Sequence, residues 1–160
     1  MPIKDMIVKE LVVSYSGVFD IHDFLDFLKK YMKQNGYDMT EKLYDSKAKA
    51  SINSIKIKWA CEKKATDYDM YNIALTIDFT DIKEGKIEGK KVVEGNLKVL
   101  IEAEHEKDYD EKWRKKPTLN FMRAVYDKFI IESKEQKLAK KLKEEANDIA
   151  DEIKKYLNIE

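Results

Sequence analysis

The sequence predicts a two-layer α+β domain, in which an antiparallel sheet of about five strands is covered by helices. The first observation is a strict alternation over residues 71–79, where every second residue is apolar (Tyr71, Ile73, Leu75, Ile77, Phe79). This is the period of a half-buried strand, and the stretch is taken as the central one. The second is the expected element order, β-α-β-β-β-β-α-α, because consecutive strands with short links favour an antiparallel meander. The apolar face of such a sheet needs a helical cover.

Length and charge limit the class of protein. The 160 residues fit one domain, here residues 1–160, with enough bulk for a real core. Lys and Arg together number 31, as do Asp and Glu, so the formal net charge is zero. A neutral total argues against a nucleic-acid binder of the usual basic kind.

The expected location is the cytoplasm. Cys61 is the single cysteine, which excludes an internal disulfide and favours a reducing compartment. No apolar signal segment follows a basic start, and no run of about 18 apolar residues could form a transmembrane segment. A soluble protein is therefore predicted.

The amino-terminal third predicts a strand followed by a helix. Residues 6–15 form the first strand, and Gly17 provides a turn. Asp20 is a suitable N-cap for a helix over 21–34, which ends at Asn35 and Gly36. Its buried face has the helical period and consists of Ile21, Phe24, Leu25, Leu28 and Met32.

Four further strands are expected before residue 105. Residues 37–45 form a less regular strand, with Tyr37, Met39 and Leu43 on one face, and residues 46–51 are a polar connection. Residues 52–62 follow, with Ile55, Ile57, Trp59 and Cys61 pointing inward. After the central strand, 80–91 are read as a long exposed hairpin tip and 92–104 as the last strand, where Gly95 indicates a bulge.

Two helices are expected at the carboxyl end. Pro117 suits the first turn of a helix over 118–131, and Ser133 with Gln136 fits a capping box that starts a new helix or a kink. The helix over 134–158 is amphipathic, with a narrow apolar stripe formed by Leu138, Leu142, Ile149, Ile153 and Tyr156. A narrow stripe suits a helix–helix seam, so self-association through this helix is predicted.

No catalytic residue, metal site or cofactor is predicted. The two histidines, His22 and His105, lie near acidic residues, but no ligand spacing repeats. Cys61 falls on an inward strand face, which favours a core thiol over a nucleophile. Phosphate-loop and dinucleotide-binding glycine patterns are absent from the sequence.

A basic and aromatic run is the best candidate for contact with a polyanion. It comprises Lys112, Trp113, Arg114, Lys115 and Lys116. Lysines of the last helix could extend it towards nucleic acid or an anionic membrane. The alternative is a charged connector in which Trp113 packs on the edge of the core.

Three functions follow from these observations. The first is a non-enzymatic binding or interaction module whose partner is a second copy or another protein. The second is a small apolar-ligand binder, because the element order is similar to that of several lipid- and steroid-binding families, in which a curved antiparallel sheet holds a long helix. Its pocket would be lined by Trp59, Tyr71, Leu75, Phe129 and Ile130. The third is an enzyme that uses Asp78 or Glu102 in the same pocket.

Overall fold

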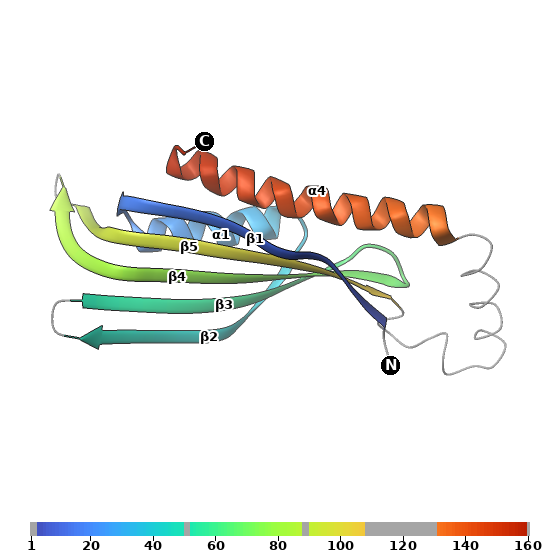
Figure 1. The fold of residues 1–160 in the computed structure, drawn as a ribbon, viewed down its shortest axis with the longest axis horizontal. Coiled ribbons are helices and arrows are strands. Elements are labelled where there is room, and N and C mark those ends of the chain that lie inside the picture. Colours follow the sequence, from blue (N-terminus) through green and yellow to red (C-terminus); the bar gives the residue numbers. More distant parts are fainter. Residues whose placement is uncertain (1–2, 50–51, 88–89, 108–130, 160) are drawn as a thin grey trace.

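A computed structural model describes residues 3–49, 52–87, 90–107 and 131–159 (Figure 1). The elements are β1 (Ile3–Phe19), α1 (Ile21–Gln34), β2 (Asp38–Lys49), β3 (Ile52–Lys64), β4 (Asp69–Ile87), β5 (Lys90–Lys107) and α4 (Ile131–Leu157). The predicted α+β class is confirmed. Within the described segments, no helix is long and apolar enough to cross a membrane.

All five strands belong to one antiparallel sheet in the order β1-β5-β4-β3-β2. The strand predicted from residues 71–79 lies within β4, the middle strand, and its five apolar residues are at most 1% exposed. Consecutive strands pair from β2 to β5, as expected for a meander. Strand β1 joins the far side of β5, so β1 and β2 are the two edges.

Helix α1 forms where its sequence signals predict it. The Asp20 carboxylate accepts a hydrogen bond from the Asp23 backbone N–H at 3.1 Å and so caps the helix. Phe24, Leu28 and Met32 are fully buried. The Phe24 ring packs perpendicular to the Phe79 ring of β4, with the two ring centroids 6.3 Å apart. The helix therefore lies on the inner face of the sheet.

Helix α4 covers the β1 and β5 side of that same inner face (Figure 1). Leu142 and Ile153 are 0% exposed and Ile149 is 2% exposed within the single chain. Tyr156 stacks on Phe27 of α1 with ring centroids 4.5 Å apart. The stripe that predicts a seam between copies is thus already packed against this chain's own sheet and α1.

Polar contacts also attach α4 to the sheet. Lys63 of β3 forms a partly buried ion pair with Glu145, and its ammonium lies 4.7 Å from the centre of the Tyr37 ring. The Tyr71 hydroxyl donates to the backbone carbonyl of Leu138 at 2.8 Å. These contacts fix the helix in rotation as well as in position.

A register shift in β2 changes which residues face the helices. Glu41 pairs with Trp59, whereas Leu43 pairs with Lys58 and Tyr44 with the inward Ile57, so the shift falls between Glu41 and Leu43. Such a bulge reverses the alternation. The prediction that Leu43 shares the face of Met39 is therefore wrong: Leu43 is 37% exposed on the outer side, and Tyr44 takes the inner position.

Strands β4 and β5 form the long hairpin that the sequence predicts. Their pairing extends to Ile87 and Lys90, with a register shift between Thr80 and Lys83. Gly95 lies opposite this shift, where a Cβ atom would stand 2.9 Å from the Thr80 carbonyl oxygen. The bulge expected at Gly95 is therefore present, although the extra residue belongs to β4.

Some boundaries differ from the prediction. Residues 46–49, expected as a connection, continue strand β2. Helix α4 begins at Ile131, so Ser133 lies inside the helix rather than at its cap. The remainder of the predicted helix over 118–130 lies outside the described residues, as do Phe129, Ile130 and the basic run 112–116.

Candidate functional site

A groove separates α1 from the inner face of β2 and β3. Helix α4 packs on the opposite flank of α1, where Tyr156 contacts Phe24 and Phe27. The flank of α1 that faces away from α4 borders two adjoining hollows. This groove is the candidate site.

One stripe of α1 forms the helical wall of the groove. Ile21, Leu25, Lys29 and Lys33 follow one another at intervals of four residues and therefore share a face. Ile21 and Leu25 are half-buried and face the wider hollow. Lys29 borders both hollows, and Lys33 borders the narrower one. The wall thus changes from apolar to basic along the helix.

The inner faces of β3 and β2 form the floor. Ile55, Ile57 and Trp59 alternate inward on β3, as the sequence predicts. Glu41 and Tyr44 supply the β2 side, and Tyr44 reaches the groove only because the bulge reverses its orientation. The far end is closed by the β4–β5 hairpin, through Glu84, Gly85, Val92 and Val93.

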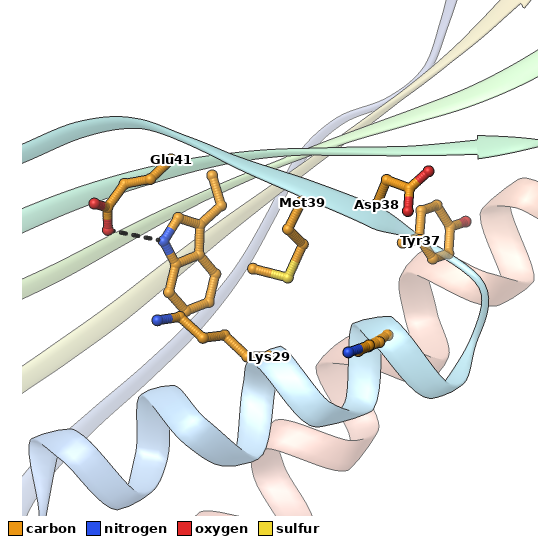
Figure 2. Close-up of a pocket in the computed structure, with 7 residues that line it drawn as sticks. Lys29, Tyr37, Asp38, Met39 and Glu41 are labelled. Atoms are coloured by element: carbon orange, nitrogen blue, oxygen red, sulfur yellow. Dashed lines mark hydrogen bonds between the residues drawn. The ribbon is translucent and has the colours of Figure 1, made fainter.

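Trp59 and Lys29 meet across the middle of the groove. Figure 2 shows Lys29 on α1 and Glu41 on β2 on the two sides of this groove. The Lys29 ammonium lies 5.4 Å from the centre of the Trp59 ring, a cation–π arrangement. The Trp59 Nε1–H donates to the Glu41 carboxylate at 3.3 Å. Both hollows are lined by these three residues, which together form a partition between them.

The wider hollow has a volume of about 670 Å³ and the narrower one about 410 Å³. Small-molecule sites usually enclose about 300–1,000 Å³. The wider hollow is lined mostly by apolar side chains, whereas the narrower one has Lys29, Lys33, Asp38 and Glu41 beside Tyr37, Met39 and Trp59. Each hollow alone is large enough for a small ligand.

Of the three predicted pocket residues that the structure describes, one lies at this site. Trp59 lines both hollows. Tyr71 and Leu75 are instead buried in the core, at 1% and 0% exposed. The Tyr71 hydroxyl is hydrogen-bonded to a backbone carbonyl of α4. The sequence-based pocket does not include the helical wall. The four-residue spacing from Ile21 to Lys33, which places these side chains on one face of α1, is the sequence signal that could have identified it.

The carboxylates considered for catalysis lie on the other side of the sheet. Asp78 pairs across strands with Lys56 and Lys98, and its carboxylate is 4.0 Å from the Lys56 ammonium. Glu102 borders a shallow surface hollow beside Ala60 and Ala74 on the same outer face. The sheet therefore separates both carboxylates from the groove.

His105 belongs to a separate buried cluster. Its Nε2 lies 2.7 Å from an oxygen of Asp69, with the histidine 1% and the aspartate 7% exposed. The Thr66 hydroxyl donates to the other Asp69 oxygen at 2.6 Å, and the Tyr71 ring meets the imidazole edge-on. These contacts hold the turn before β4 against the end of β5.

The remaining reactive candidates have structural surroundings. Burial raises the pKa of the Cys61 thiol to about 12, which suppresses the nucleophilic thiolate. Across the described segments, no group of three or more His, Cys, Asp or Glu side chains could hold a metal ion. The groove is thus the arrangement best suited to a ligand.

Comparisons of the whole chain with family models, with curated proteins and with solved structures find no match. Function must therefore be inferred from the residues of the groove themselves.

Proposed function

We propose that this protein is a non-enzymatic binding protein that holds a small, largely apolar molecule between α1 and the inner face of β2 and β3. The observation that carries the proposal is the wide hollow of about 670 Å³, which α1 lines with Ile21 and Leu25 and the sheet with Ile55, Ile57 and Trp59. Apolar walls with a few polar groups are typical of small-ligand sites.

The arrangement of the two helices supports a ligand in this groove. Helix α4 lies mainly over the β1 and β5 side of the sheet, and no described helix fills the space beside the outer flank of α1. Ile21, Leu25 and Ile55 are only partly buried there. Removing their remaining apolar surface from water favours binding by about 25 cal/mol per Å².

Self-association through α4 receives less support from the packing. The central stripe residues, Leu142, Ile149 and Ile153, could meet a second copy only if the helix left its own core. Such a rearrangement would expose the apolar inner face of β1 and β5 to water. A ligand in the groove requires no rearrangement of this kind.

The test is native mass spectrometry of the purified protein, with titration by neutral and charged amphiphiles. The proposal expects one ligand per chain and a rise in the unfolding midpoint on saturation, because a ligand at a hundred times its Kd stabilises a protein by about 2.7 kcal/mol. Failure of every apolar probe to bind at submillimolar concentration would contradict it.

Two matched variants locate the binding. Leu25→Phe adds bulk to the wall of the wide hollow and is expected to weaken binding about tenfold. Leu43→Phe makes the same exchange on the outer side of β2, at an exposed position, and should leave binding unchanged. Equal effects of both variants would place the ligand elsewhere.

A further inference from the structure

The polar groups of the groove define which head group a ligand should carry. Among the described residues, the wide hollow is bordered by three carboxylates, those of Asp20, Glu41 and Glu84, by the Lys29 ammonium and by the His22 imidazole. The Asp20 carboxylate also caps α1, so the positive end of that helix is already occupied by a carboxylate. The surroundings of the wide hollow therefore favour a positive charge.

The Trp59 ring supplies a second, independent preference for a cation. Its face already holds the Lys29 ammonium at 5.4 Å, and its Nε1–H donates to Glu41 at 3.3 Å. Tryptophan is the best of the aromatic side chains at binding cations. A carboxylate at the ring edge adds an attractive charge close to any cation on the ring face.

We infer that the ligand is an amphipathic organic cation, an amine or quaternary ammonium with an apolar body, whose head group takes the place of the Lys29 ammonium on Trp59. This inference rests on the proposed ligand-binding function and names its chemical class. The apolar body lies along Leu25, Ile55 and Ile57 in the wide hollow.

Lys29 occupies the head-group position in the structure. Trp59 is only 2% exposed although it borders both hollows, and the Lys29 ammonium lies over its ring. Lys29 itself is an exposed residue on the helical wall, so its side chain can swing into water without disturbing the core. A ligand cation can therefore replace it by exchange rather than by unfolding.

An anionic ligand fits less well. Lys33, the second ammonium of the helical wall, borders only the narrow hollow, where Asp38 and Glu41 balance Lys29 and Lys33. An anionic head in the wide hollow would meet, among the described side chains, the Lys29 ammonium and the His22 imidazole but also three carboxylates. An apolar molecule with a carboxylate head is thus the informative competitor.

The experiment compares three probes with alkyl chains of nine or ten carbons: decyltrimethylammonium, decanol and decanoate, each below micelle-forming concentration. Titrations use calorimetry and the fluorescence of Trp59, with Trp113→Phe in the background because the chain has two tryptophans. The inference expects decyltrimethylammonium to bind at least about tenfold more tightly than decanol and decanoate, as about 1.4 kcal/mol of cation–π and charge interaction would give.

Charge variants at the partition test the assigned roles. Glu41→Gln keeps an oxygen acceptor for Trp59 but removes the charge, and should weaken only the cationic probe, by about three- to tenfold. Glu62→Gln removes the same charge from the outer face of β3 and is the control.

A lysine pair tests the displacement of Lys29. Lys29→Met keeps the apolar stem and should raise the affinity for the cationic probe several-fold, whereas Lys30→Met, on an exposed part of α1, should not change that affinity.

The outcomes distinguish a failure of this inference from a failure of the proposed function. Binding of decanol or decanoate as tightly as the cation would overturn the inference and leave the ligand-binding function in place. No binding by any of the three probes would count against both. A cation preference that Glu41→Gln and Glu62→Gln reduce equally would also overturn the inference, because long-range charge would then account for it.

Discussion

Replacement of Leu142 by alanine tests whether α4 belongs to this chain's core or to a seam between copies. Leu142 is 0% exposed at the middle of the helix, and its neighbour one turn later, Ala146, is too small to fill the space left behind. Leu→Ala exchanges at such sites cost about 2–5 kcal/mol through lost transfer energy and a residual cavity. We expect a loss of about 3 kcal/mol.

The assay is urea unfolding followed by circular dichroism at several protein concentrations. With a slope of about 2 kcal/mol per molar urea, a loss of 3 kcal/mol lowers the midpoint by about 1.5 M. Lys143→Ala, at an exposed position beside Leu142, should change the free energy of unfolding by less than about 0.5 kcal/mol.

The concentration series decides between the two packings. A stripe packed within one chain gives a midpoint that is independent of protein concentration, whereas a seam between copies gives a midpoint that rises with it. A loss below about 1 kcal/mol for Leu142→Ala, or a concentration-dependent midpoint of the unsubstituted protein, would refute the packing of α4 within its own chain.

Three further predictions concern the sheet. Gly95→Ala should destabilise the protein by more than about 1 kcal/mol in thermal unfolding, since the new Cβ would meet backbone oxygen at 2.9 Å, whereas Gly85→Ala, with its nearest backbone oxygen at 3.9 Å, should be nearly neutral. Asp69→Ala should lower the free energy of unfolding by about 2 kcal/mol, because it leaves His105 buried without its carboxylate partner. A double-mutant cycle with His105→Ala should show a coupling energy of about 1 kcal/mol. Additive losses would indicate that the two residues act independently. Burial raises the pKa of Cys61 from 9.0 to about 12, so its thiol should react with disulfide reagents at pH 8 only as fast as the chain opens. The free energy of unfolding should fall between about pH 9 and pH 12, because the thiol loses its proton in the unfolded chain before it does in the folded one. Cys61→Ala should remove this part of the alkaline loss of stability.

Local signals were sufficient for much of the fold. The alternation in residues 71–79 identified the middle strand, and Asp20 with the apolar period after it placed α1 at its observed bounds. Both signals arise within a few residues of the chain, from side-chain period and from capping. Because they need no distant partner, they can be recognised in the sequence alone.

The bulge in β2 shows where local signals end. Alternation in residues 37–45 placed Leu43 with Met39, but the pairing of Glu41 with Trp59 and of Tyr44 with Ile57 places Tyr44 inward instead. A strand's register depends on its neighbour, and one extra residue exchanges the two faces. The floor of the groove was therefore decided by strand pairing.

The surface that the α4 stripe contacts is likewise set by the tertiary structure. A narrow apolar stripe fits a second copy and a sheet equally well, because its period describes the helix and not its partner. The order of strands places β1 beside β5, and α4 covers the inner face of that pair.

The sequence by itself determined the order of the strands, the α1 helix and the apolar face of the middle strand, since each depends on neighbouring residues. Only the tertiary structure decided that Leu142 faces its own sheet and that Lys29 lies over Trp59. Lys29 and Trp59 belong to different elements, and Glu41 reaches the indole from a third. The site arises from how α1, β2 and β3 approach one another, and that approach is set by packing over the whole sheet.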